Sequence, residues 1–242
     1  MRRNVKFIVS TEVAELFPDL RIAILTVRQM DNHGEDSELQ QLKEQAALKI
    51  YNEHTYETLS KLAQIEAWRD AYRAFGVNPK NSRPTAEAFL RRLTKGESFP
   101  TISKAVDSYL LVETEYFLPV GGYDLEKLQG DIVLRRSPGA ESFVPIGGVA
   151  EELTRPGEVV YTDDTRVLTR KWNFKDCDNS KITESSTSIV LFTEAPFANL
   201  STESLQSSVS RMAELITNSC GGYSTTSFLD VSTSRTIELP NQ

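Results

Sequence analysis

The N-terminal part of the chain begins with two apolar, β-branched runs that predict strands. These runs are VKFIVS and RIAILTVRQ, and the intervening TEVAELFPDL predicts a short helix that ends at Pro18. We expect the two runs to form a small N-terminal sheet. Residues 36–75 then carry apolar side chains at every third or fourth position, which predicts two helices separated near His54 and Thr55.

The middle of the chain adds helices, and the C-terminal part adds strands. Residues 85–93 and the segment ISKAVDSYLLVE predict two further helices. The next segment, PVGGYDLEKL, has the pattern of an apolar stop, a glycine pair and an acidic helical turn. Short runs bounded by Gly, Pro and Asp then predict the strands DIVLRR, SFVPIGG, EVVYTD, RVLTRKW, SIVLFTEA, TSFLDVS and RTIEL. One helix, at residues 205–216, interrupts these strands.

The order of these elements predicts an α+β fold, with a helix-rich N-terminal half and a strand-rich C-terminal half packed as helices against a β layer. No internal repeat or linker divides the chain, so we expect a single domain over residues 1–242. Its parts are N-terminal strands and a helical extension (1–67), a central region (68–195) and a C-terminal helix with strands (196–242). A hydrophobic content of 39% in 242 residues is sufficient for a buried core.

Composition and missing motifs narrow the class of protein. No run approaches the roughly 20 apolar residues of a membrane helix, and the N-terminus lacks the features of a signal peptide, so we expect a cytoplasmic protein without membrane contact. Cys177 and Cys220 lie far apart, which argues against a disulfide framework and a zinc knuckle. The P-loop, GxSxG and HExxH motifs are absent, and the two histidines, His33 and His54, offer little for a catalytic site. We expect no cofactor and no metal.

Charge is unevenly distributed along the chain. The net charge of −7 argues against a protein that binds nucleic acid by general neutralisation of phosphates. Residues 69–104 nevertheless carry eight basic and three acidic side chains, so this segment could face a polyanion. Arg83, Arg91 and Arg92 are its candidate RNA contacts. A solvated helical surface of ordinary charge explains the same residues equally well.

Two glycine pairs are candidate parts of a ligand site. Gly121 and Gly122 follow Pro-Val, and Gly147 and Gly148 follow Pro-Ile. Paired glycines allow a ligand to approach backbone N–H donors closely. Simple turns or bulges are the alternative explanation of both pairs.

The segment TRKWNFKD, residues 169–176, combines cations, an aromatic ring, an amide and a carboxylate at a predicted strand end. Arg170, Trp172 and Asn173 are therefore candidate substrate contacts, and Asp176 is a candidate proton acceptor. The alternative has Trp172 in the core and the charges on a surface turn. The hydroxyl-rich run SKITESSTS follows, and its Thr183 and Thr187 could line the same cavity.

The order of these motifs resembles the B3/B4 domain of the β subunit of bacterial phenylalanyl-tRNA synthetase, and most closely its free-standing homologues. The matching elements are AVDSYLLVETEYFLPVGGYDLEKLQGDIVLRR, VPIGG, VVYTDD, RKWN and ITESST, together with RAFGVNPKNSRPTAEAFLRRL. The residues that follow the family pattern in order are Asp107, Tyr109, Pro119, Tyr123, Asp124, Leu125, Lys127, Leu128, Gly130 and Arg135. The resemblance covers residues 68–195.

The resemblance implies an editing module and not a complete synthetase, because the chain is too short for a synthetic core and lacks class II motifs. In the synthetase this domain hydrolyses tyrosine wrongly esterified to the phenylalanine tRNA. The implied function is therefore a trans-acting aminoacyl-tRNA deacylase without aminoacylation activity. Gly121 and Gly122 fall at the rim of the family's amino-acid pocket, where they or the second glycine pair could stabilise an oxyanion.

The sequence departs from the family at functional positions. The histidine of the family's Pro-His-Ala-Phe-Asp element falls at or beside Gly121, and residues 171–176 replace its Met-Gly-Gly-x-x-Ser element. The glutamate that reads the tyrosine hydroxyl has no certain counterpart, although Asp176 and Asp178 could substitute for it. Two other classes therefore stay open. One is a non-catalytic module that binds an amino acid, an aromatic metabolite or an RNA end, and the other is a scaffold without a ligand.

Overall fold

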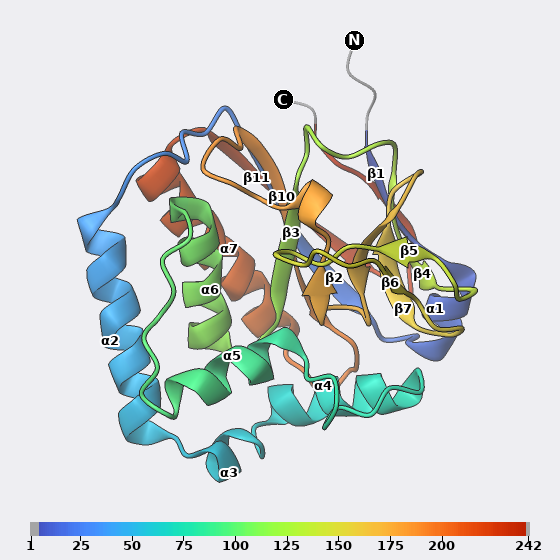
Figure 1. The fold of residues 1–242 in the computed structure, drawn as a ribbon, viewed down its shortest axis with the longest axis horizontal. Helices are drawn as coiled ribbons and strands as arrows, with labels where there is room; N and C mark the ends of the chain where they lie inside the picture. Colours follow the sequence, from blue (N-terminus) through green and yellow to red (C-terminus); the bar gives the residue numbers. More distant parts are fainter. Residues whose placement is uncertain (1–4, 241–242) are drawn as a thin grey trace.

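Two β-sheets and a set of helices make up the computed structural model, which describes residues 5–240 (Figure 1). The six-stranded sheet has the order β12 (Thr236–Glu238), β1 (Lys6–Val9), β4 (Ile132–Arg136), β7 (Val159–Thr162), β8 (Val167–Arg170) and β9 (Lys175–Asp176). The four-stranded sheet has the order β11 (Tyr223–Asp230), β2 (Arg21–Arg28), β10 (Ser188–Ala195) and β3 (Val120–Asp124). A separate antiparallel pair consists of β5 (Ser142–Phe143) and β6 (Glu152–Leu153).

Most of the described helices begin after a residue whose side chain accepts a hydrogen bond from the first turn. They are α1 (Thr11–Leu16), α2 (Ser37–Glu53), α3 (Tyr56–Leu59), α4 (Ala63–Ala74), α5 (Thr85–Leu93), α6 (Lys104–Tyr116) and α7 (Thr202–Cys220), with a 3₁₀ turn at Asp178–Ser180. Asp36 caps α2, Ser103 caps α6 and Ser201 caps α7. Pro84 precedes α5 and provides no side-chain cap, and α4 also begins without one.

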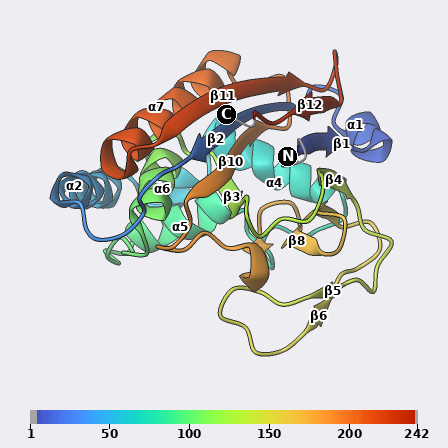
Figure 2. The ribbon, with the colours of Figure 1, turned by 90° about the horizontal axis from the view of Figure 1, so that it is seen from above.

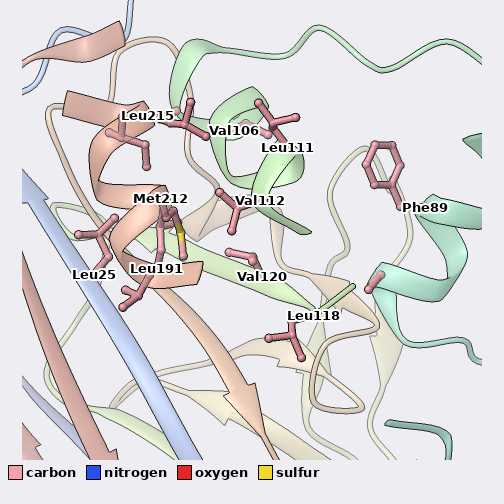
Figure 3. Close-up of a cluster of buried hydrophobic side chains, with 14 of the residues drawn as sticks. Leu25, Phe89, Val106, Leu111, Val112, Leu118, Val120, Leu191, Met212 and Leu215 are labelled. Carbon is pink, nitrogen blue, oxygen red and sulfur yellow. The ribbon is translucent and has the colours of Figure 1, made fainter. Parts of the chain in front are cut away.

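The four-stranded sheet lies between two hydrophobic cores, because helices cover one face and the six-stranded sheet covers the other (Figure 2). On β2, Leu25 and Val27 contribute to the helical core, and Ile22 and Ile24 contribute to the core between the sheets. Burial on both faces explains why this strand is apolar without alternation. Figure 3 shows the helical core, where side chains of α6 and α7, Met212 among them, meet this sheet.

The predicted α+β class and the packing of helices against a β layer are confirmed. The prediction of a small N-terminal sheet was wrong. β1 pairs with β4 and β12, whereas β2 pairs with β10 and β11 in the other sheet. Hydrophobic patterns identify strands, but strand partners depend on which faces are covered, and the local pattern does not contain that information.

Two further predictions of elements need correction. The break near His54 and Thr55 is confirmed, but residues 36–75 form three helices, since a turn at 60–62 separates α3 from α4. The glycine pair predicted to follow an apolar stop lies inside β3, which pairs with β10 along its whole length. A strand with two glycines has little β propensity of its own, so its pairing with β10 determines its conformation.

Candidate functional site

A cavity of about 80 Å³, lined by buried and half-buried residues and called the buried cavity below, lies beside β3, the strand at the edge of the four-stranded sheet. Both sheets, α6, the first residue of α5 and the turn after β8 contribute to its walls. Its polar lining residues are Thr85, Tyr109, Glu113, Tyr123, Tyr161, Thr169, Asn173, Asp176 and Glu194. Its other lining residues are Leu110, Pro119, Val120, Gly121, Trp172, Phe174 and Phe192. None of these described residues is Lys, Arg or His, so the walls present three carboxyl groups without a basic partner.

Asp176 accepts hydrogen bonds from a chain of hydroxyl groups. Thr169 Oγ1 donates to Asp176 Oδ1 at 2.5 Å, and the Tyr123 hydroxyl lies 2.6 Å from the same Thr169 oxygen. Because the Thr169 proton is directed to the carboxylate, Tyr123 is the donor in the second bond. Burial raises the pKa of Asp176 to about 6, against the lowering effect of the Thr169 hydrogen bond. A carboxyl with this pKa can exchange a proton near neutral pH.

Glu194 occupies another part of the cavity wall on β10. Trp172 Nε1 donates to its Oε1 at 2.9 Å, and the Tyr161 hydroxyl donates to the same oxygen. Burial raises the pKa of Glu194 to about 7, although both hydrogen bonds act in the opposite direction. The pKa of Tyr161 is raised well above its ordinary value, chiefly by burial and also by this carboxyl.

Glu113 and Asn173 bring unpaired polar atoms to the cavity. Glu113 on α6 is fully buried, and neither carboxyl oxygen accepts a well-formed hydrogen bond. Burial raises the pKa of Glu113 strongly, the Val120 N–H offsets this in part, and the charge of Asp176 raises it further. Asn173 Oδ1 accepts a 2.7 Å hydrogen bond from the Tyr72 hydroxyl, whereas its Nδ2 is buried without an acceptor. Such groups are costly to bury unless a ligand satisfies them.

The raised pKa of Glu194 predicts that this residue makes stability depend on pH. Because the folded protein holds this proton more tightly than the unfolded chain, the stabilising contribution is complete below about pH 4.5 and is lost as pH rises through about 7. Relative to Glu194→Gln, the wild type should lose on the order of 3 kcal/mol of unfolding free energy between these limits. Urea denaturation across this pH range measures the difference, with the exposed Glu203→Gln as control. A difference independent of pH would contradict the prediction.

An open groove of about 660 Å³ adjoins the buried cavity. The two share Tyr109 and Asp176, so they meet at these residues. Its remaining lining residues are His33, Ile102, Val106, Gly122, Ile146, Lys181, Ile182, Thr183, Glu184 and Ser185. Ile102 and Ile146 are 54% and 52% exposed, so the groove offers apolar surface to a ligand from solvent.

The two glycines of β3 have different surroundings and lie on different cavities. Gly121 lines the buried cavity, and a Cβ added to it would meet nothing within 4 Å. Gly122 lines the groove, and a Cβ there would overlap the Val190 carbonyl oxygen and lie 3.0 Å from Leu191 Cα. The missing side chain at Gly121 therefore leaves room in the cavity, whereas Gly122 permits the close pairing of β3 with β10.

Gly122→Ala should therefore destabilise the protein more than Gly121→Ala. The clash with β10 is expected to lower the free energy of unfolding by about 1–3 kcal/mol, as for other overpacked sites. The Gly121 substitution should stay within about 0.5 kcal/mol of the wild type. Urea denaturation of the two variants measures both effects, and equal losses would contradict the steric argument.

The predicted contacts in residues 169–176 divide into two groups. Trp172 and Asn173 line the buried cavity, and Trp172 is fully buried in the core between the sheets as well. Arg170 is not among the lining residues of either cavity. Its guanidinium forms ion pairs with Glu158 and with Glu152, the latter at 2.8 Å. Its charge is thus already neutralised within the fold.

The remaining predicted ligand contacts are spread over the loops. Gly147 and Gly148 lie between β5 and β6 and line neither cavity, although Ile146 beside them lines the groove. Thr183 lines the groove, whereas Thr187 is exposed and bonds Glu126 at 3.4 Å. Asp178, the alternative to Asp176 as the counterpart of the family's glutamate, lines neither cavity and pairs with Lys181 at 2.5 Å.

The three predicted RNA contacts lie on or just before α5, whose first residue, Thr85, lines the buried cavity. Each already has an intramolecular partner. Arg83 lies 3.5 Å from Glu87 and Arg92 lies 2.7 Å from Glu97, whereas Arg91 stacks 4.6 Å from the Tyr56 ring centre. Arg92 is the most exposed of the three, with 54% of its side chain accessible.

Sequence reasoning missed Glu113, Glu194 and Tyr161. Glu194 had a usable signal, because it is the single charged residue in the otherwise apolar or hydroxyl-bearing strand SIVLFTEA. Glu113 had none, since a glutamate on an amphipathic helix is usually solvated. The convergence of these residues depends on the pairing of β3 with β10 and on the position of α6.

Comparison with known proteins gives a family and a related structure. The family model described as the B3/4 domain matches residues 67–221. A crystal structure of an N-terminal fragment of the phenylalanyl-tRNA synthetase β-subunit from Pyrococcus horikoshii is similar, with a TM-score of 0.48 and 14% identity. The match covers 92% of this chain and 51% of that chain, so the chain spans about half the length of that fragment. No curated protein matches.

Residues 5–240 contain neither a membrane-spanning helix nor a cluster of metal ligands. No helix among them is both long and apolar enough to cross a membrane. No group of three or more His, Cys, Asp and Glu side chains in this part of the chain is arranged to hold a metal ion.

Proposed function

Because the chain belongs to the B3/4 domain family, we propose that it hydrolyses the ester of a mischarged aminoacyl-tRNA in trans. One observation carries the proposal. A buried polar cavity and an open, partly apolar groove meet at Asp176, a carboxyl group whose pKa is raised to about 6 by burial. A substrate with a small polar part and a larger flat part, joined by a hydrolysable bond, matches this arrangement.

The two parts of the substrate correspond to the two cavities. The aminoacyl group occupies the buried cavity beside Gly121, where Trp172 and Asn173 contact it. The terminal nucleoside of the tRNA occupies the groove, where Ile102 and Ile146 supply apolar surface for a base. The ester then lies at the junction, within reach of Asp176.

Asp176 acts as the general base in this proposal. Its carboxylate takes a proton from a water molecule as the water oxygen attacks the ester carbonyl carbon. The tetrahedral intermediate collapses with cleavage of the bond to the ribose oxygen, which takes the proton back from Asp176. The products are the free amino acid and a tRNA with a free terminal hydroxyl. The Tyr123–Thr169 hydrogen-bond chain keeps the Asp176 carboxylate oriented.

Two N–H groups are suitable donors for the oxyanion. Along an antiparallel strand, successive N–H groups point alternately toward the partner and away from it. The Leu125 N–H donates to the Ser188 carbonyl on the β10 side at 2.9 Å, so the Gly122 N–H, three residues earlier, points to the free edge. Asn173 Nδ2 is the second donor, since it is buried without an acceptor.

The RNA backbone would approach along α5 and the rim of the groove. Arg83, Arg91 and Arg92 are the proposed phosphate contacts on one side, and Lys181 is the cation that lines the groove on the other. Binding requires exchange of their intramolecular partners for phosphate. We therefore expect tRNA affinity to be moderate and sensitive to salt.

The test is hydrolysis of total tRNA that is charged separately with each amino acid. The proposal predicts accelerated loss of one or a few amino acids over the spontaneous rate, with no aminoacylation when ATP and free amino acid are supplied. Spontaneous rates throughout the whole panel would overturn it.

A second candidate function is a non-catalytic module that binds an amino acid or an RNA end. The specific observation in its favour is that no histidine is among the residues lining the buried cavity. Saturable binding of a charged tRNA without turnover would support this function over hydrolysis.

A further inference from the structure

We propose that the buried cavity recognises a free α-ammonium group, held between Glu113 and Asp176. The inference rests on the proposed function in one respect, namely that the ligand is an aminoacyl group. It assigns to Glu113 a specificity role, and it predicts that esters with a blocked amino group are rejected.

The first observation is that Glu113 and Asp176 line the same cavity, and that no cation is among its described lining residues. Both line the cavity, and the charge of Asp176 is among the causes that raise the pKa of Glu113. Two carboxylates in a shared site of low polarity cannot both ionise at neutral pH unless a positive charge lies near them. Among the described lining residues no Lys, Arg or His supplies that charge, so the ligand is the available source.

The second observation is that neither Glu113 oxygen accepts a well-formed hydrogen bond, although the Val120 N–H lies close enough to lower its pKa in part. Both of its oxygens are buried, and the residue is 0% exposed. An unsatisfied carboxyl group in the core reduces stability, and an ammonium group with three donors would satisfy it. The neighbouring aromatic side chains Tyr109 and Trp172 offer ring surfaces that favour a cation further.

The chemistry of an aminoacyl ester indicates that the ammonium group bound in the cavity is the α-ammonium. The α-amino nitrogen is bonded to the carbon next to the ester carbonyl, so it lies near the reacting carbon whatever the side chain. Asp176 lines both the cavity and the groove, where the ester lies in the proposed function. The group nearest to Asp176 on the cavity side is therefore the α-ammonium.

Recognition of the ammonium also affects the protonation of both carboxyl groups. The positive charge favours their ionised forms, so Glu113 loses its proton and Asp176 stays ionised as the proton acceptor. Binding should consequently release protons to the solvent. An N-acylated ester carries no such charge, and it would bring an amide into a cavity with three carboxyl groups.

The experiment uses stable amide analogues of 3′-aminoacyl-adenosine, with side chains from alanine to tyrosine, each in a free-amine and an N-acetyl form. Calorimetric titration of the full chain at pH 7, in two buffers of different ionisation heat, gives affinity and released protons. We expect at least one free-amine analogue to bind about 10-fold or more tightly than its N-acetyl form, with proton release. Glu113→Gln should weaken free-amine binding by about 10- to 100-fold and reduce the release, with the N-acetyl form unchanged.

Glu115→Gln is the matched control, because Glu115 lies on the same helix but is exposed and pairs with Arg211. It should bind both forms as the wild type does. The inference would be overturned if the wild type bound the free-amine and N-acetyl analogues with equal affinity, or bound neither. This outcome does not depend on whether any variant folds. Hydrolysis of charged tRNA together with equal affinities would leave the proposed function standing. A Glu113-dependent preference without hydrolysis would reject the enzyme and keep the inference.

Discussion

Asp176→Asn is expected to lower the rate of aminoacyl-ester hydrolysis by about 10²- to 10⁴-fold, the usual range for loss of a general base. The amide has nearly the shape of the carboxyl group and can still accept the Thr169 hydrogen bond, so the hydroxyl chain stays in place. It cannot take a proton from water. Single-turnover deacylation of the responsive tRNA measures the effect, because this assay separates the chemical step from binding.

The pH profile gives an independent check of the same assignment. At enzyme concentrations far below saturation, where the rate reports the ligand-free enzyme, a base with a pKa of about 6 predicts that the wild-type rate rises with pH up to about 6 and then levels. The variant should lose this inflection. Asp70→Asn is the control, because Asp70 is exposed on α4, pairs with Arg73 and lines neither cavity. An Asp176→Asn rate within a few-fold of the wild type would remove Asp176 from the mechanism.

Trp172→Ala is expected to lower the free energy of unfolding by about 3–5 kcal/mol, the range for deletion of a large buried aromatic side chain. Trp172 is 0% exposed and packs edge-on against Trp68 and Phe17, with ring centres 5.1 and 4.8 Å apart. Its removal would leave a void between the sheets. It would also leave Glu194 with one donor fewer. Urea denaturation followed by circular dichroism measures the loss.

Replacement by phenylalanine separates the hydrogen bond from the packing. Trp172→Phe keeps most of the ring volume but removes the donor to Glu194, whereas the indole N–H of Trp68 has no partner to lose. The Trp172 variant should therefore be less stable than Trp68→Phe by about 1–3 kcal/mol, the cost of an unsatisfied buried group. Equal stabilities would show that the Glu194 hydrogen bond contributes nothing.

The elements of the fold could be predicted from local patterns to a large extent, and their partners could not. The long helices and the strands β4, β7 and β10 follow from apolar periodicity and from the Gly, Pro and Asp residues that bound them. The local sequence of β1 and β2 does not indicate that they pair with strands far along the chain. The strand β3 could not be predicted, because its two glycines lower its β propensity and its conformation depends on pairing with β10.

The same distinction applies to the candidate site. Asp176, Asn173 and Trp172 could be found because they lie close together in an unusual sequence segment. Arg170 belongs to the same segment, but its side chain pairs with Glu158 and Glu152, whose proximity only the sheet establishes. Glu113 could not be predicted as a site residue. The helical periodicity predicts which face of α6 is buried, but it does not predict which polar groups of other elements pack against that face.

The position of β2 in the four-stranded sheet has a consequence for how the chain folds. Arg21–Arg28 lies between strands at residues 188–195 and 223–230. It can therefore pair only after most of the chain has been synthesised. Contacts of such large sequence separation are slow to form, and an unpaired apolar strand is prone to aggregate meanwhile. A fragment trimmed to residues 67–221 would lack both β2 and β11. It would leave the apolar strand β10 with an open edge, and we expect it to be recovered as aggregate.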